Sequence, residues 1–117
     1  MAENKEKQIS KATQEKIQEL QMMQQRLTIF AAQRQQLQLQ TLDVEAALKE
    51  LEGAKAPAYK LVGELLIEKP IVELKKELND KKSDVDLHLK TIEKQENKIR
   101  ESALEIQKEV TKSLEKQ

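Results

Sequence analysis

Apolar residues recur at alternating spacings of three and four between positions 20 and 51. If Leu20 occupies the first core position of a heptad, eight of the ten core positions in this stretch are apolar. The core positions are Leu20, Met23, Leu27, Phe30, Arg34, Leu37, Thr41, Val44, Leu48 and Leu51. This spacing is typical of a coiled-coil seam, so it predicts a long helix over about residues 8–52.

A second stripe follows position 70 and predicts another long helix over about residues 70–115. Its ladder of seven-residue steps consists of Ile71, Leu78, Val85, Ile92, Ile99 and Ile106. Most core positions between these rungs are polar, Lys81 and His88 among them, while Leu89, Ala103 and Val110 widen the stripe from one place further on. Polar core positions predict loose packing at the middle of this helix.

The segment between the two helices contains every glycine and proline of the chain. These are Gly53, Pro57, Gly63 and Pro70. The β-prone runs 59–62 and 65–69 are separated by Gly63-Glu64, and two strands joined by a Gly-first pair predict a β-hairpin with a type II′ turn. Gly53 is placed to end the first helix and Pro70 to begin the second. We therefore expect one domain, with a linker and hairpin over about residues 53–69.

Neither helix can bury its apolar stripe alone, which predicts that the chain folds back into an antiparallel two-helix coiled coil. Residues whose numbers sum to about 123 would then lie side by side, so that Leu51 faces Val72 and Leu20 faces Ala103. Both ends of the chain would meet at one distal tip. A lone two-stranded ribbon with apolar side chains is marginal in water and has two open edges. We expect it to pair with other hairpins, although a local cap over its own helix ends is an alternative.

Composition excludes several classes of function. The 117 residues include no Cys and one His, so disulfides, thiol catalysis and common zinc sites are not expected. Two glycines ten residues apart cannot form a phosphate-binding loop, and no cofactor is expected. The 21 basic residues balance 21 acidic ones, which disfavours nucleic-acid binding. The sequence has neither a secretory signal nor a membrane-length apolar run, so we expect a cytoplasmic protein.

The hairpin segment Tyr59-Lys60-Leu61-Val62-Gly63, followed by Leu65-Leu66-Ile67, resembles the β-type subunit of the prefoldin family, as does the stretch 91–96. The eukaryotic subunit most similar to this type is the sixth. The resemblance implies a mostly α fold with one hairpin that joins an intersubunit β-barrel. It implies a heterohexamer of two α-type and four β-type subunits, which holds unfolded client proteins at its coiled-coil tips without ATP. It also implies delivery of these clients to a group II chaperonin.

Two groups of residues are the candidate sites. The assembly hairpin comprises Tyr59, Leu61, Val62, Gly63, Leu65, Leu66 and Ile67. The candidate client-binding residues near the tip are Ile9, Ile17, Leu20, Met22, Met23, Leu104, Ile106, Val110 and Leu114. Among the tip residues, Leu20, Met23 and Ile106 fall on the seams and would serve to close the coil, whereas Met22, Leu104 and Leu114 fall outside them.

Other functions remain open at this point. A helical hairpin could serve as a passive tether or scaffold, and the holding of aggregation-prone clients separates that function from a chaperone. A nucleic-acid-binding arm is disfavoured by the neutral charge. We expect no enzyme, because no pairing of a nucleophile with a base and no acid–base pair is discernible in the sequence.

Overall fold

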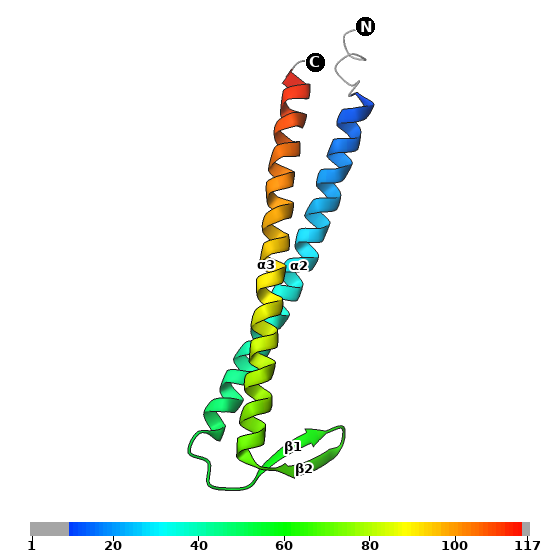
Figure 1. Ribbon diagram of the computed structural model, residues 1–117. Coiled ribbons are helices and arrows are strands. Elements are labelled where there is room, and N and C mark those ends of the chain that lie inside the picture. The colour runs from blue at the N-terminus through cyan, green and yellow to red at the C-terminus, as the bar shows by residue number, and fades with distance from the viewer. Residues whose placement is uncertain (1–9, 116–117) are drawn as a thin grey trace. The chain divides into compact units, whose positions relative to one another are not determined.

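The computed structural model describes residues 10–115. Helix α2 (Lys11–Leu51) is followed by strands β1 (Ala58–Val62) and β2 (Leu65–Lys69) and by helix α3 (Ile71–Glu115) (Figure 1). The predicted order of helix, hairpin and helix is confirmed. The described residues divide into two units, with the division between Gln33 and Arg34 in α2 and between Thr91 and Ile92 in α3. In each unit a segment of α2 lies antiparallel to a segment of α3.

The helix ends follow from local chemistry. At the start of α2, the Ser10 hydroxyl accepts a hydrogen bond from the backbone N–H of Thr13 at 3.1 Å, as an N-cap residue does. After α2, Gly53 adopts a φ of 72°, a left-handed conformation that ends helices and suits glycine. The carbonyl of Pro70 accepts the first backbone hydrogen bond of α3, from the N–H of Leu74 at 3.1 Å.

The unit that contains the helix ends near the termini is closed by a narrow apolar seam. Ile92 and Val110 of α3 are buried, as is Thr13 of α2. An ion pair of 3.1 Å between Lys16 and Glu109 places these two levels of the helices side by side. The sequence did not indicate that Glu96 is also buried, with 1% of its surface exposed. Its carboxylate accepts a hydrogen bond from Arg100, one turn further along α3.

In the other unit the seam of α2 lies where the heptad predicts it, and Leu74 and Val85 of α3 are buried as predicted. Only the later core positions between the ladder residues of α3 are displaced. Leu37 and Val44 are buried in α2. In α3 the predicted core positions Lys81 and His88 are exposed, and Leu89 is half-buried instead. From position 85 onward the buried and half-buried side chains of α3 follow one another at alternating steps of four and three residues. After 85 and 89 they lie at positions 92, 96, 99, 103, 106 and 110. The prediction that His88 lies in the seam is therefore wrong, because α3 turns its more apolar side toward α2.

The pairing of the helices also differs slightly from the expected one. Val72 does not face Leu51, because 78% of its surface is exposed, whereas Leu74 is buried. An ion pair of 3.4 Å joins Lys82 to Glu45, and these numbers sum to 127 rather than 123. The level of α3 that lies beside a given level of α2 is therefore a few residues further along the chain than expected.

The hairpin has the predicted antiparallel register. Leu61 pairs with Leu66, and Val62 pairs with Leu65, which leaves Gly63-Glu64 as a two-residue turn. Gly63 has a φ of 61°, and no residue other than glycine has a positive φ among the described residues. A positive φ at the first turn residue alone is the pattern of a type II′ turn, as predicted.

Candidate functional site

The apolar side chains of the hairpin lie open to solvent. They are Tyr59, Leu61, Val62, Leu65, Leu66 and Ile67, and Leu66 is 69% exposed. Directly paired residues share a face of the ribbon, and successive pairs alternate between the two faces. The Leu61–Leu66 pair therefore lies on one face and the Val62–Leu65 pair on the other. Both faces of the ribbon are therefore apolar.

A cavity of about 470 Å³ lies between β1, the end of α2 and the start of α3. Leu51, Leu74 and Leu78 contribute apolar walls, and the backbone and side chains of β1 contribute another side. Apolar packing between β1 and these helix ends is therefore incomplete.

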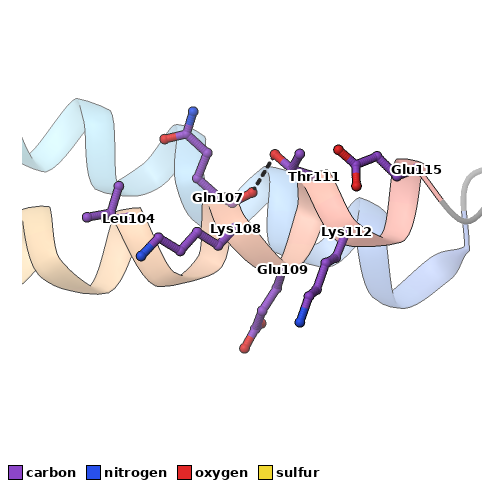
Figure 2. A pocket seen from close by; sticks show the side chains of 7 residues that line it. All are labelled: Leu104, Gln107, Lys108, Glu109, Thr111, Lys112 and Glu115. Atoms are coloured by element: carbon purple, nitrogen blue, oxygen red, sulfur yellow. Dashed lines mark hydrogen bonds between the residues drawn. The ribbon is translucent and has the colours of Figure 1, made fainter.

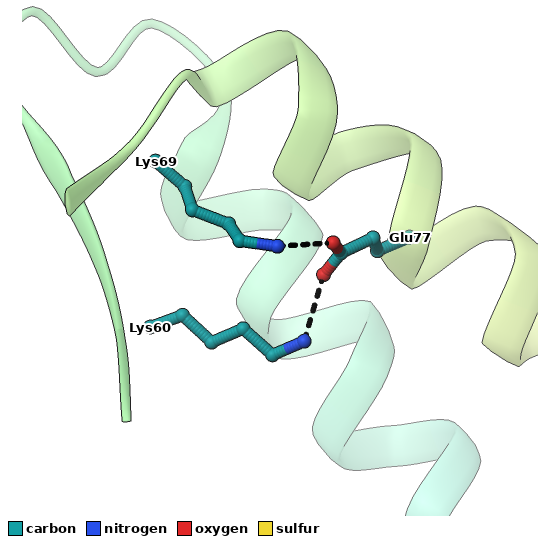
Figure 3. A network of polar contacts seen from close by, with 3 residues as sticks. All are labelled: Lys60, Lys69 and Glu77. Atoms are coloured by element: carbon teal, nitrogen blue, oxygen red, sulfur yellow. Dashed lines mark hydrogen bonds and ion pairs between the residues drawn. The ribbon is translucent and has the colours of Figure 1, made fainter. Parts of the chain in front are cut away.

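The carboxylate of Glu77 joins the hairpin to α3 (Figure 3). The ammonium group of Lys69, on β2, donates a hydrogen bond to Glu77 Oε1 at 2.6 Å, and that of Lys60, on β1, donates to Oε2 at 3.0 Å. The hydrogen bonds from Lys69 and Lys60 lower the pKa of Glu77. The hydrogen bond to Glu77 raises the pKa of Lys69. Both lysines are therefore engaged in a contact within the chain.

The candidate client-binding residues divide into exposed and seam positions. Met22, Leu104 and Leu114 are exposed, with Met22 at 63%. The half-buried positions are Ile17, Leu20, Met23 and Ile106, and Val110 is buried. Ile9 lies outside the described residues. The exposed side chains agree with their positions outside the predicted seams.

A cavity of about 550 Å³ accompanies Leu104 along the last turns of α3 (Figure 2). Its lining residues are Leu104, Gln107, Lys108, Glu109, Thr111, Lys112 and Glu115. The Thr111 hydroxyl is occupied by a hydrogen bond of 2.9 Å to the carbonyl of Gln107. The surface thus combines one exposed leucine with the long aliphatic stems of two lysines and the carboxylates of two glutamates.

Further exposed apolar residues were not singled out in the sequence. They are Ile29, Leu39, Leu42 and Leu87. Ile29 lies seven residues after Met22 and so shares its side of α2, where both side chains are open to solvent. Their apolar character at heptad positions outside the core could have indicated in the sequence that they are exposed.

Two other kinds of site are not found in the part of the chain that the structure describes. Within residues 10–115, no group of three or more His, Asp or Glu side chains is placed to hold a metal ion. Neither described helix has an apolar stretch of sufficient length to cross a membrane.

Comparison with known proteins identifies the architecture. Residues 14–117 match the prefoldin subunit family. The chain belongs to the prefoldin family. It is 36% identical over 101 residues to the prefoldin β subunit of Archaeoglobus fulgidus, a match that covers 85% of this chain and 87% of that protein. It is also 36% identical over 105 residues to the β subunit of Methanothrix thermoacetophila, with 86% of each chain covered.

The fold agrees with this relationship. The crystal structure of the prefoldin β subunit from Thermococcus strain KS-1 matches with a TM-score of 0.84 and 28% identity, over 92% of this chain and 96% of that one. The predicted resemblance to the β type, with its two long helices and single hairpin, is confirmed. Prefoldin is a family of chaperones and not of enzymes.

Proposed function

We propose that this chain is the β-type subunit of a heterohexamer of two α-type and four β-type subunits, which works as an ATP-independent holdase. In this assembly the hairpins form an intersubunit β-barrel, and the ends of the coiled coils hold unfolded clients and deliver them to a group II chaperonin. The family relationship to archaeal β subunits supports this function and a cytoplasmic location. The observation that carries the proposal is the hairpin, whose apolar side chains are exposed on both faces.

The size of the exposed hairpin surface favours assembly through it. Six apolar side chains on one short ribbon, each exposed, form a larger patch than the scattered apolar residues of ordinary surfaces. A second ribbon could pair with an open edge through backbone hydrogen bonds and cover these side chains at the same time. The hairpin would then be an obligate interface.

The client-binding surface is proposed at Met22, Leu104 and Leu114. Met side chains adapt to partners of varied shape, which suits a surface that binds unfolded chains of many sequences. Each patch is small, so affinity would come from several subunits that act on one client together. Weak individual contacts would also let a client exchange between subunits.

The experiment mixes the chain with the two-hairpin α-type subunit of its source and measures mass by light scattering. The same sample is then tested for suppression of the aggregation of a chemically unfolded client without ATP. We expect a hexamer that suppresses aggregation. A monomer or dimer that leaves aggregation unchanged would contradict the proposal, and a hexamer without holding activity would favour the scaffold alternative.

Two sets of variants separate the proposed surfaces. Leu61→Glu with Leu66→Glu should prevent hexamer formation. Met22→Glu with Leu104→Glu should leave the mass unchanged and abolish most of the holding activity. The matched control is Leu42→Glu with Leu87→Glu, which alters two equally exposed residues away from the helix ends. Equal losses in the tip and control variants would contradict the assigned client surface.

A further inference from the structure

Few contacts hold the hairpin in place relative to the helices. Its apolar side chains are exposed, and the space beneath β1 is a cavity rather than a packed core. Among the described residues, no hydrogen bond or ion pair joins a hairpin side chain to either helix other than those made by Lys60 and Lys69 to Glu77. The orientation of the ribbon therefore depends on polar contacts.

Glu77 makes these contacts in a way that restrains more than one motion. Each oxygen of the carboxylate takes a different lysine, and each lysine comes from a different strand (Figure 3). The paired residues Lys60–Ile67 and Ala58–Lys69 lie on the same face of the ribbon, since they are separated by one intervening pair. One contact would leave the ribbon free to roll about it. Two contacts at different points along one face restrain both roll and tilt.

We infer that Glu77 is a positioning residue for assembly, which fixes the direction in which the hairpin presents its apolar surface to neighbouring subunits. This inference rests on the proposed assembly through the hairpin. β2 enters α3 through Lys69, Pro70 and Ile71, so this junction is the point about which an untethered ribbon would turn. The two lysines thereby restrain the hairpin of their own chain. Glu77 influences the interface between subunits although its side chain is not part of that interface.

The contacts are half-exposed, and half-exposed ion pairs are weak. Their effect is therefore a bias in orientation and not a large gain in the stability of the fold. A ribbon that samples several orientations spends less time in the one that can pair, which reduces its apparent affinity by the same fraction. Loss of Glu77 should weaken assembly while the helices remain folded.

The orientation can be measured directly on the full chain. The sequence has no cysteine, so Glu64→Cys in the turn and Asp84→Cys on α3 allow two spin labels to be attached at chosen sites. Electron–electron resonance then gives the distribution of distances between them. We expect Glu77→Gln to broaden this distribution and the matched control Glu93→Gln to leave it unchanged. An unchanged distribution in Glu77→Gln would overturn the inference.

A double-mutant cycle tests whether Glu77 acts through the two lysines. In a chain that already carries Lys60→Met and Lys69→Met, the further change Glu77→Gln should have no added effect on the distance distribution. A merely structural role of Glu77 within α3 would persist in this background. An equal broadening with and without the lysines would therefore overturn the inference.

Assembly is measured on the full chain mixed with its two-hairpin partner. The subunit concentration needed for half-assembly should rise roughly 3- to 10-fold in Glu77→Gln, a size consistent with weak surface pairs. Circular dichroism should show unchanged helix content. An assembly curve equal to that of the natural chain would overturn the inference. Failure of the natural chain to assemble would instead overturn the proposed function, so the two failures are distinguishable.

Discussion

The buried position of Ile92 provides a direct test of the seam in α3. Ile92 is 2% exposed, whereas Leu87, five residues earlier, is 67% exposed. Ile92→Ala removes three carbon atoms from the seam, which at about 0.8 kcal/mol each amounts to ~2.4 kcal/mol of lost burial. The cavity left behind adds to this cost, so we expect a total of about 3 kcal/mol. Leu87→Ala should change the free energy of unfolding by less than about 0.5 kcal/mol.

Thermal unfolding followed by circular dichroism converts these energies into temperatures. An unfolding entropy of about 2.1 cal/mol/K per residue gives roughly 0.25 kcal/mol/K for a chain of this size. Ile92→Ala should therefore lower Tm by about 12 °C, and Leu87→Ala by no more than about 2 °C. Both variants are measured at the same chain concentration, because association changes apparent stability. Equal shifts in Tm would refute the assignment of Ile92 to the seam.

Three further predictions concern helix ends, the turn and pH. Ser10→Ala removes the N-cap of α2 and should cost about 1 kcal/mol, seen as faster amide exchange in the first turn and not at the middle of α2. Gly63→Ala meets no neighbouring atom within 4 Å but places a side chain at a positive φ, so it should destabilise the hairpin by roughly 1–2 kcal/mol, and normal exchange protection at Val62 would contradict this. Since the pKa of Glu77 is below its ordinary 4.5, its contacts should persist above that pH and be lost as the pH falls through the lowered value. Those of Lys69, whose pKa lies above 10.5, should be lost only as the pH rises through the raised value. Spin-label distances measured from acid to alkaline pH would reveal both limits, and a loss of order near neutral pH would contradict the assignment.

The sequence was sufficient to predict the elements because each boundary has a local cause. Gly53 and Pro70 mark the ends of the helices, and a Gly-first pair between two β-prone runs specifies the turn. The seam of α2 was also predictable, since its apolar residues keep a regular heptad. These features depend on local backbone conformation and on periodicity, and both are determined by residues close together in the sequence.

The seam of α3 was harder to predict because two stripes share its ladder. Polar residues at 81 and 88 occupy the position three after each rung, whereas Leu89 occupies the position four after. The helix is oriented so that the positions four after each ladder residue face α2. The apolar residues Leu89, Ala103 and Val110 at these positions indicated this orientation in the sequence. Glu96 belongs to the same row, but a carboxylate gives no apolar signal, so its burial could not be predicted.

The candidate sites were predicted in part. Exposure of Met22, Leu104 and Leu114 followed from their places outside the heptad core, since a two-helix seam covers only one side of each helix. The contacts of Lys60 and Lys69 with Glu77 could not be predicted in the same way. They depend on the direction in which the ribbon leaves the helices, which is a property of the folded chain and not of any local pattern.

Pairing of the helices level by level has a consequence for how such a chain can change its length. Lys16 lies beside Glu109, and Glu45 lies beside Lys82, so each level of α2 has its own counterpart in α3. Seven residues inserted into one helix alone would put every level beyond the insertion out of step with its counterpart. Seven residues inserted into both helices at matching levels would add one complete layer and preserve all the others. The two helices are therefore expected to lengthen or shorten together, by whole heptads.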